Sequence, residues 1–137
     1  MSMAQSMNAL IEKTSTYDKD ERYMATNDLC TELQRDTKLD GTLERRICAA
    51  VMKQLDDPSN DVQSIAVKTL GVLVKKVAEQ QVSEIADKLC SLVLEGKKEL
   101  RDIYSIGLKT LISDMPMETG HTLAGRISTR LIAGIKR

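Results

Sequence analysis

Residues 62–77 read VQSIAVKTLGVLVKKV, and no other stretch says as much about the fold. The apolar residues recur at intervals of three and four, which is the spacing of one face of an α-helix. This face is wide, so the helix must pack against more than one neighbour. A similar pattern occurs in residues 23–36, YMATNDLCTELQRD, and in residues 100–112, LRDIYSIGLKTLI. The chain therefore repeats one helical unit three times.

The three stretches align position by position. Ala25 corresponds to Ala66, 41 residues later, and Ala66 corresponds to Tyr104, 38 residues later. These offsets are typical of HEAT and armadillo repeats. The aligned sets are Arg22, Ala25, Leu29 and Leu33; Gln63, Ala66, Leu70 and Val74; and Arg101, Tyr104, Leu108 and Ile112.

Each of these helices, here called B helices, follows another amphipathic stretch, here called an A helix. The pattern predicts A helices at about 3–13, 42–55 and 79–94, B helices at about 20–36, 60–77 and 98–114, and a seventh helix at about 121–136. Gly96 is expected to end its helix in the left-handed conformation, and Pro116 is expected to stop the helix before it.

The sequence thus predicts an all-α fold, a HEAT/armadillo-like right-handed α-solenoid of three helix pairs plus one extra helix. We expect a single domain over 1–137, with repeats at about 3–36, 42–77 and 79–114 and an incomplete fourth repeat at 121–137, whose apolar stripe would be partly uncovered. The B helices would line the concave side. A compact four-helix bundle is the alternative fold. The residues expected in the core include Ala25, Leu29, Ala66, Leu70, Leu108 and Leu111.

Composition narrows the class of protein. Twenty basic residues balance twenty acidic ones, which argues against a nucleic-acid partner. No apolar run reaches the about 18 residues of a membrane span, and residues 1–13 lack the plan of a signal peptide. Cys30, Cys48 and Cys90 are far apart, so we expect buried free thiols rather than a metal site, in a soluble intracellular protein.

Residues for catalysis are scarce. His121 is the single histidine and is expected in an exposed turn, and the common phosphate-binding, nucleophile and zinc motifs are absent. The acidic runs 18–21 and 56–61 lack the spacing of a calcium-binding EF-hand and suit turns and helix caps better. We therefore expect no enzyme activity, no cofactor, no metal and no small-molecule substrate. Basic residues near the end of the chain indicate a solvated face or a site for an acidic partner: Arg126, Arg130, Lys136 and Arg137.

The sequences of the three B helices resemble the opening repeats of the cullin-associated, neddylation-dissociated family. The segment Asp18-Lys19-Asp20 before the first B helix and the segment Lys38-Leu39-Asp40 after it resemble the same family. The resemblance covers about residues 8–114 and fades after Pro116. It implies a regulator of cullin-RING ubiquitin ligases that assists SCF-type assembly in the cytoplasm and nucleus. Such proteins wrap an unneddylated cullin and its RING subunit, with the N-terminal repeats near the cullin C-terminal region. Displacement of the adaptor belongs to the distant C-terminal repeats, so the resemblance does not assign it to this chain.

Binding residues would lie opposite the core stripe of each B helix, on its concave side. At about 100° per residue, Asn27 and Thr31 lie about 200° from Ala25 and Leu29. The candidates on this face and its flanks are Asn27, Asp28, Thr31, Lys68, Val72, Lys75 and Lys109. An ordinary solvated position is the alternative for each.

Two alternative functions remain open at this stage. The chain could be a generic HEAT-repeat adaptor with another partner, such as a transport or phosphatase scaffold. It could also be an enzyme with an unrecognised site around His121. If it binds a cullin, we expect weak binding through Tyr, Arg or Met anchors, because Phe and Trp are absent and Tyr104 takes a core position, leaving little aromatic surface.

Overall fold

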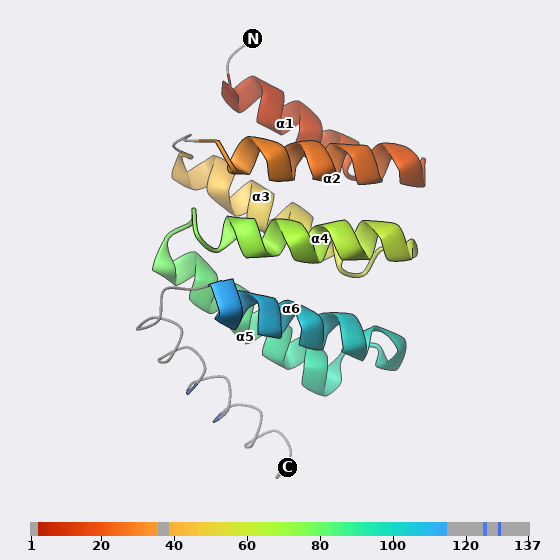
Figure 1. Cartoon of the computed structure of the whole chain (residues 1–137), viewed down its shortest axis with the longest axis vertical. Coiled ribbons are helices and arrows are strands. Elements are labelled where there is room, and N and C mark those ends of the chain that lie inside the picture. Colours follow the sequence, from red (N-terminus) through yellow and green to blue (C-terminus); the bar gives the residue numbers. More distant parts are fainter. Residues whose placement is uncertain (1–2, 36–38, 115–124, 126–128, 130–137) are drawn as a thin grey trace.

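The structure is a computed structural model, which describes residues 3–35, 39–114, 125 and 129. The described residues form helices and turns and contain no strand, so the prediction of an all-α fold is confirmed (Figure 1). In chain order the elements are α1 (Met3–Lys13), α2 (Lys19–Leu33), α3 (Gly41–Gln54), α4 (Asn60–Leu73), α5 (Glu79–Glu95), the short 3-10 helix η1 (Lys98–Leu100) and α6 (Arg101–Asp114).

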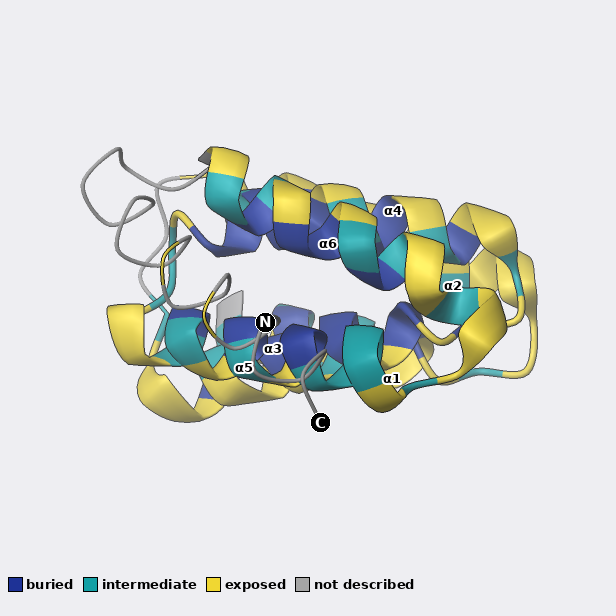
Figure 2. Cartoon of the chain, turned by 90° about the horizontal axis from the view of Figure 1, so that it is seen from below, coloured by how far each residue is buried: buried dark blue, intermediate teal, exposed yellow. Residues whose placement is uncertain are grey.

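The helices stack in two layers. The A helices α1, α3 and α5 form one layer, and the B helices α2, α4 and α6 form the other (Figure 1). Each helix packs on its partner in the pair and on the equivalent helix of the adjacent pair, so α4 lies between α2 and α6. Figure 2 shows buried residues where the layers face each other and exposed residues on the outer sides. This layered stack is the HEAT-like solenoid rather than a compact bundle.

The core between the layers is aliphatic, as expected. The six predicted core residues are all buried, with Leu29, Ala66, Leu70 and Leu111 fully inaccessible. Cys30, Cys48 and Cys90 are buried thiols outside any disulfide, so they pack as small apolar side chains. Tyr104 is also buried, at the position that the earlier repeats fill with alanine.

Gly96 ends α5 as predicted, but in a different backbone conformation. Its φ of −77° and ψ of −176° are extended, so the expectation of a left-handed glycine is wrong. A Cβ on Gly96 would lie against the Leu92 carbonyl oxygen and 3.0 Å from Cε2 of Tyr104. The glycine is therefore required by close packing rather than by backbone conformation.

Two B helices end earlier than their apolar pattern suggests. α2 ends at Leu33 rather than Asp36, and α4 ends at Leu73 rather than Val77. After α4 the backbone tightens, since Lys75 N–H donates to the Val72 carbonyl and Lys76 N–H to the Leu73 carbonyl. These hydrogen bonds between residues three positions apart form a 3-10-like turn. The turn keeps apolar residues facing the core after the helix has ended.

Aspartates cap the helices and join the repeats. The Asp18 carboxylate accepts from the Asp20 N–H at 2.9 Å and caps α2, and the Asp40 carboxylate accepts from the Leu43 N–H at 2.7 Å and caps α3. The acidic run 56–61 instead forms a turn, since the N-cap of α4 is Ser59, which makes no side-chain cap hydrogen bond. In the α3–α4 turn, Asp57 accepts from Nε and Nη2 of Arg22 at 2.8 and 3.1 Å. The adjacent Asp56 accepts from the Tyr104 hydroxyl at 2.5 Å. The α3–α4 turn thus contacts α2 of the preceding repeat and α6 of the following repeat.

The seventh helix predicted for 121–136, the uncovered stripe of the incomplete fourth repeat and His121 lie outside the described residues, apart from Gly125 and Thr129.

Candidate protein-binding face

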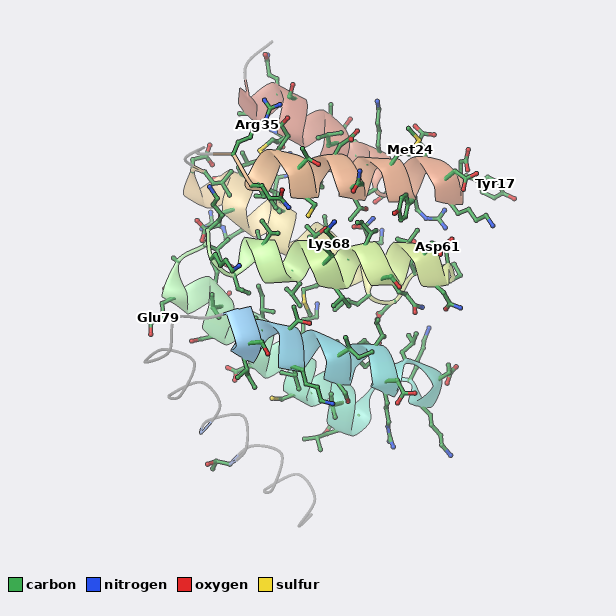
Figure 3. All side chains as sticks on the ribbon, viewed as in Figure 1. Tyr17, Met24, Arg35, Asp61, Lys68 and Glu79 are labelled. Atoms are coloured by element: carbon green, nitrogen blue, oxygen red, sulfur yellow. The ribbon has the colours of Figure 1, made fainter. Side chains whose placement is uncertain are left out.

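The outward side of α2, α4 and α6 forms one continuous surface, called the B face below. Six of the seven candidate residues are exposed: Asn27, Asp28, Thr31, Lys68, Lys75 and Lys109. Val72 is partly buried. Figure 3 shows Lys68 near the middle of α4, between its two neighbouring B helices. Lys75 lies in the turn that follows α4 rather than on the helix itself.

The B face divides into two regions. Asp28 and Thr31 face the groove between α1 and α2, where the space has a volume of about 570 Å³. The other residues that line this groove are Ser6, Ala9, Leu10, Lys13, Glu32 and Arg35. The Thr31 hydroxyl donates to the Asn27 carbonyl at 3.0 Å, so it is already bonded to its own helix.

The second region is basic. Lys68, Lys75 and Lys109 form no ion pair with any described residue. They lie on or next to α4 and α6, which pack directly against each other. Cations without local partners keep their full charge for a partner surface, so this region favours acidic groups. The structure therefore separates the candidates into a mixed-charge groove on α2 and a basic region on α4 and α6.

Sequence reasoning missed the exposed apolar residues of the B helices. Ile106 is 47% exposed and Met24 is 63% exposed. The repeat offset of 38 residues would have identified Ile106, because it places this residue at the position of Lys68. The expectation that little aromatic surface remains is wrong, since Tyr17 and Tyr23 are both exposed.

The described residues offer no clear reaction chemistry. Burial raises the pKa of the Cys48 thiol to about 12, with the charges of Glu44 and Glu84 adding to the effect, so the thiol stays protonated at neutral pH. In residues 3–35 and 39–114, no group of three His, Cys, Asp or Glu side chains is placed to hold a metal ion. No helix of the described part has the length and apolar character needed to cross a membrane.

Known proteins resemble nearly the whole chain. It is 47% identical over 123 residues to cullin-associated NEDD8-dissociated protein 1 of Drosophila melanogaster and 45% identical over 127 residues to cullin-associated NEDD8-dissociated protein 2 of Mus musculus. It is also 42% identical over 119 residues to cullin-associated NEDD8-dissociated protein 1 of Arabidopsis thaliana. These matches cover 89%, 91% and 86% of the chain and 10% of each relative. No family model matches the chain.

The chain spans about a tenth of the length of the curated relatives it matches. High identity over almost all of the chain, together with an all-helical repeat fold that the resemblance predicts, leads to one assignment. The chain belongs to the cullin-associated NEDD8-dissociated protein family and corresponds to the N-terminal helical repeats of that family.

Proposed function

We propose that this chain is a non-enzymatic protein-binding scaffold that contacts an unneddylated cullin, at the cullin C-terminal region and its RING subunit. It would act as the N-terminal part of an assembly and exchange factor for cullin-RING ubiquitin ligases, in the cytoplasm and nucleus. The observation that carries the proposal is the identity of 42–47% to proteins named for cullin association. Adaptor displacement is left to the parts of the relatives that this chain does not match.

The physical mechanism is shape and charge complementarity without bond chemistry. Binding through the B face would place Lys68, Lys75 and Lys109 against acidic groups of the partner. Such contacts raise the association rate and fix orientation more than they raise affinity. A standard specific interface needs about 800 Å² from each partner, and three B helices provide only part of a long solenoid's surface. We therefore expect weak binding by this chain and strong binding only when further repeats engage together.

The test is a calorimetric titration of this chain with a cullin C-terminal domain bound to its RING subunit, with and without NEDD8 attached. We expect weak binding to the unmodified complex and weaker binding after neddylation. The double variant Lys68→Glu/Lys75→Glu should reduce the affinity at least about tenfold, because it replaces attraction by repulsion. The matched control is Lys97→Glu/Lys98→Glu, which reverses two exposed lysines before α6.

The outcomes separate the parts of the proposal. Tight binding by this chain alone would contradict the distributed account. Equal losses in the two double variants would show that the B face is the wrong surface. A chain that binds neither form of the complex, but captures another folded protein from lysate, would favour the alternative of a generic HEAT-repeat adaptor.

A further inference from the structure

Three of the four large apolar side chains that are exposed in the described structure lie within residues 17–24, at the start of α2. Tyr17 is 101% exposed, Met24 is 63% exposed and Tyr23 is 39% exposed, whereas Ile106 is the remaining exposed residue of this kind. Tyr17 lies in the α1–α2 turn, and Tyr23 and Met24 lie in the first turns of α2. Tyrosine and methionine are enriched in protein interfaces, so their concentration at one edge points to a contact surface.

The backbone that carries Tyr17 is held firmly. Nη1 of Arg22 donates to the Thr16 carbonyl at 3.0 Å and to the Tyr17 carbonyl at 2.8 Å. The same guanidinium binds Asp57, and both side chains are largely buried, at 14% and 8% exposure. The ring of Tyr17 therefore projects into solvent from a fixed turn. A side chain presented this way loses less conformational freedom on binding than one on a mobile loop.

The surroundings of these side chains are acidic. Asp20 and Glu21 lie in the first turn of α2, within the same eight residues as Tyr17 and Tyr23, and Asp61 lies at the start of α4. Figure 3 shows Tyr17 and Asp61 at the same end of the two neighbouring helices. Arg22 is neutralised by Asp57, which leaves Lys19 as the unpaired cation of the first turn of α2. We name this surface the tyrosine edge; it consists of Tyr17, Tyr23, Met24, Asp20, Glu21 and Asp61.

We propose that the tyrosine edge docks a basic polypeptide segment that carries arginine or lysine beside apolar side chains. Aromatic faces attract guanidinium and ammonium groups, and the three carboxylates can pair with the same cations. Met24 adds an adaptable apolar contact. An acidic partner would be repelled here. The inference does not depend on cullin binding, because it uses neither Lys68 nor Lys75 and defines the partner by its chemistry alone.

The chain offers a direct optical test, because it has three tyrosines and no tryptophan. Titration with the peptide Ac-Arg-Leu-Arg-Arg-Leu-Arg-NH₂ should change tyrosine emission in a saturable way, and the peptide Ac-Glu-Leu-Glu-Glu-Leu-Glu-NH₂ should not. Methyl NMR of labelled methionine gives a second signal. The exposed Met24 methyl should shift, while those of the buried Met7 and Met52 should not.

Two variants test which residues bind. Tyr17→Ala/Tyr23→Ala, followed through the Met24 methyl, should weaken the basic peptide about tenfold or more. Asp20→Asn/Glu21→Gln should weaken it severalfold and reduce the salt dependence of binding. The charge-matched control is Glu79→Gln/Glu84→Gln on α5, and the apolar control is Ile106→Ala; neither should change the affinity. Because all of these positions are exposed, the variants should keep the fold of the original chain. Circular dichroism checks that they do.

Three results would overturn the proposal. Equal binding of the two peptides would remove the charge argument. Equal losses in Asp20→Asn/Glu21→Gln and its α5 control would show that the peptide senses overall charge rather than this edge. A Met24 shift that depends on protein concentration without peptide, with dimers in sedimentation, would show that a second copy of the chain occupies the surface.

Discussion

At the scale of single residues, Gly96 and Gly107 of the third repeat differ in whether the structure has room for a larger side chain. A Cβ on Gly96 would meet the Leu92 carbonyl oxygen and the Tyr104 ring. A Cβ on Gly107, within α6, would have methyl groups of Leu89 and Leu70 as its nearest neighbours, at 3.5 and 3.6 Å. The first position has no room for alanine, whereas the second offers ordinary van der Waals contact.

The two alanine variants should therefore shift stability in opposite directions. Gly96→Ala should lower the free energy of unfolding by about 1–3 kcal/mol through overpacking. Gly107→Ala should raise it by up to about 1 kcal/mol, because alanine favours the helix. Urea denaturation followed by circular dichroism measures both. A stabilising Gly96→Ala would show that both the Leu92 carbonyl and the Tyr104 ring move aside freely.

Cys48 predicts a loss of stability in alkali. Its pKa rises from an ordinary 9.0 to about 12 in the folded chain, chiefly because burial disfavours the thiolate. Above pH 9 the unfolded chain releases this proton while the folded chain keeps it, so the contribution is complete below pH 9 and is lost as pH rises toward 12. The loss from one such group is about 1.4 kcal/mol per pH unit at most.

Cys48→Ala cannot ionise at this position, so its stability should fall less with pH. We expect the urea midpoint of the original chain to fall toward that of Cys48→Ala between pH 8 and pH 10.5, so that the difference between the two midpoints narrows. Burial also raises the pKa of Tyr104, with help from its hydrogen bond to Asp56, so both proteins should still lose stability in stronger alkali. A constant difference across this range would mean that the folded thiol ionises as readily as the unfolded one.

At the scale of elements, the α3–α4 turn joins three repeats. Asp57 is bound by Arg22 of α2 and also accepts from the Ser59 N–H at 2.9 Å. The Asp57 carbonyl accepts from the Gln63 side chain at 2.7 Å. Arg22 and Gln63 hold equivalent repeat positions, so successive B helices contact the same turn from both sides. This network fixes how far one pair is displaced from the next.

Asp57→Ala should destabilise the chain by about 2–4 kcal/mol, since it leaves a largely buried guanidinium without its carboxylate. Asp61→Ala, which removes an exposed carboxylate near the start of α4, should cost less than about 1 kcal/mol. Thermal and urea unfolding give the two values. A double-mutant cycle with Arg22→Met should show coupling, and additive losses would mean that the pair acts independently.

The helices could be predicted from the sequence, but the contacts between them could not. The spacing of Val62, Ile65 and Leu70 requires a helical apolar face whatever the helix packs against. By contrast, the Arg22–Asp57 pair spans 35 residues, and its formation depends on how two repeats stack. The exposure of Tyr17 follows from a turn held by that same pair, so no local pattern signals it. For the B face, helical geometry correctly predicted exposure, while ligand contacts remain a prediction.

At the scale of the whole molecule, each helix pair of the described residues packs chiefly on its neighbours. Within residues 3–35 and 39–114, α4 packs on α2, α3 and α6, whereas α1 packs mainly on α2 and α3. Stability in such a stack is a sum of repeat and interface contributions, so the ends open first.

Hydrogen exchange followed by mass spectrometry should therefore show slower exchange in α4 than in α1. The Leu70 and Leu73 amides, in the fully buried part of α4, should be among the most protected. The control is the same measurement in mild urea, where a local opening of α1 should keep a weak urea dependence. Equal protection in all helices would indicate that the chain unfolds as one cooperative unit.

The paired aspartates of the α3–α4 turn also restrict how this protein can change its length. Surface turns normally tolerate insertions and deletions better than the helices they join. Here Asp56 reaches forward to Tyr104 and Asp57 reaches back to Arg22, so both must keep their places at once. One added residue between Asp57 and α4 would alter the direction in which α4 leaves the turn and would pull the two carboxylates out of line. We therefore expect a library of single-residue insertions to lose its folded members at this turn, because an insertion between Asp57 and α4 breaks the contacts with Arg22 and Tyr104 together.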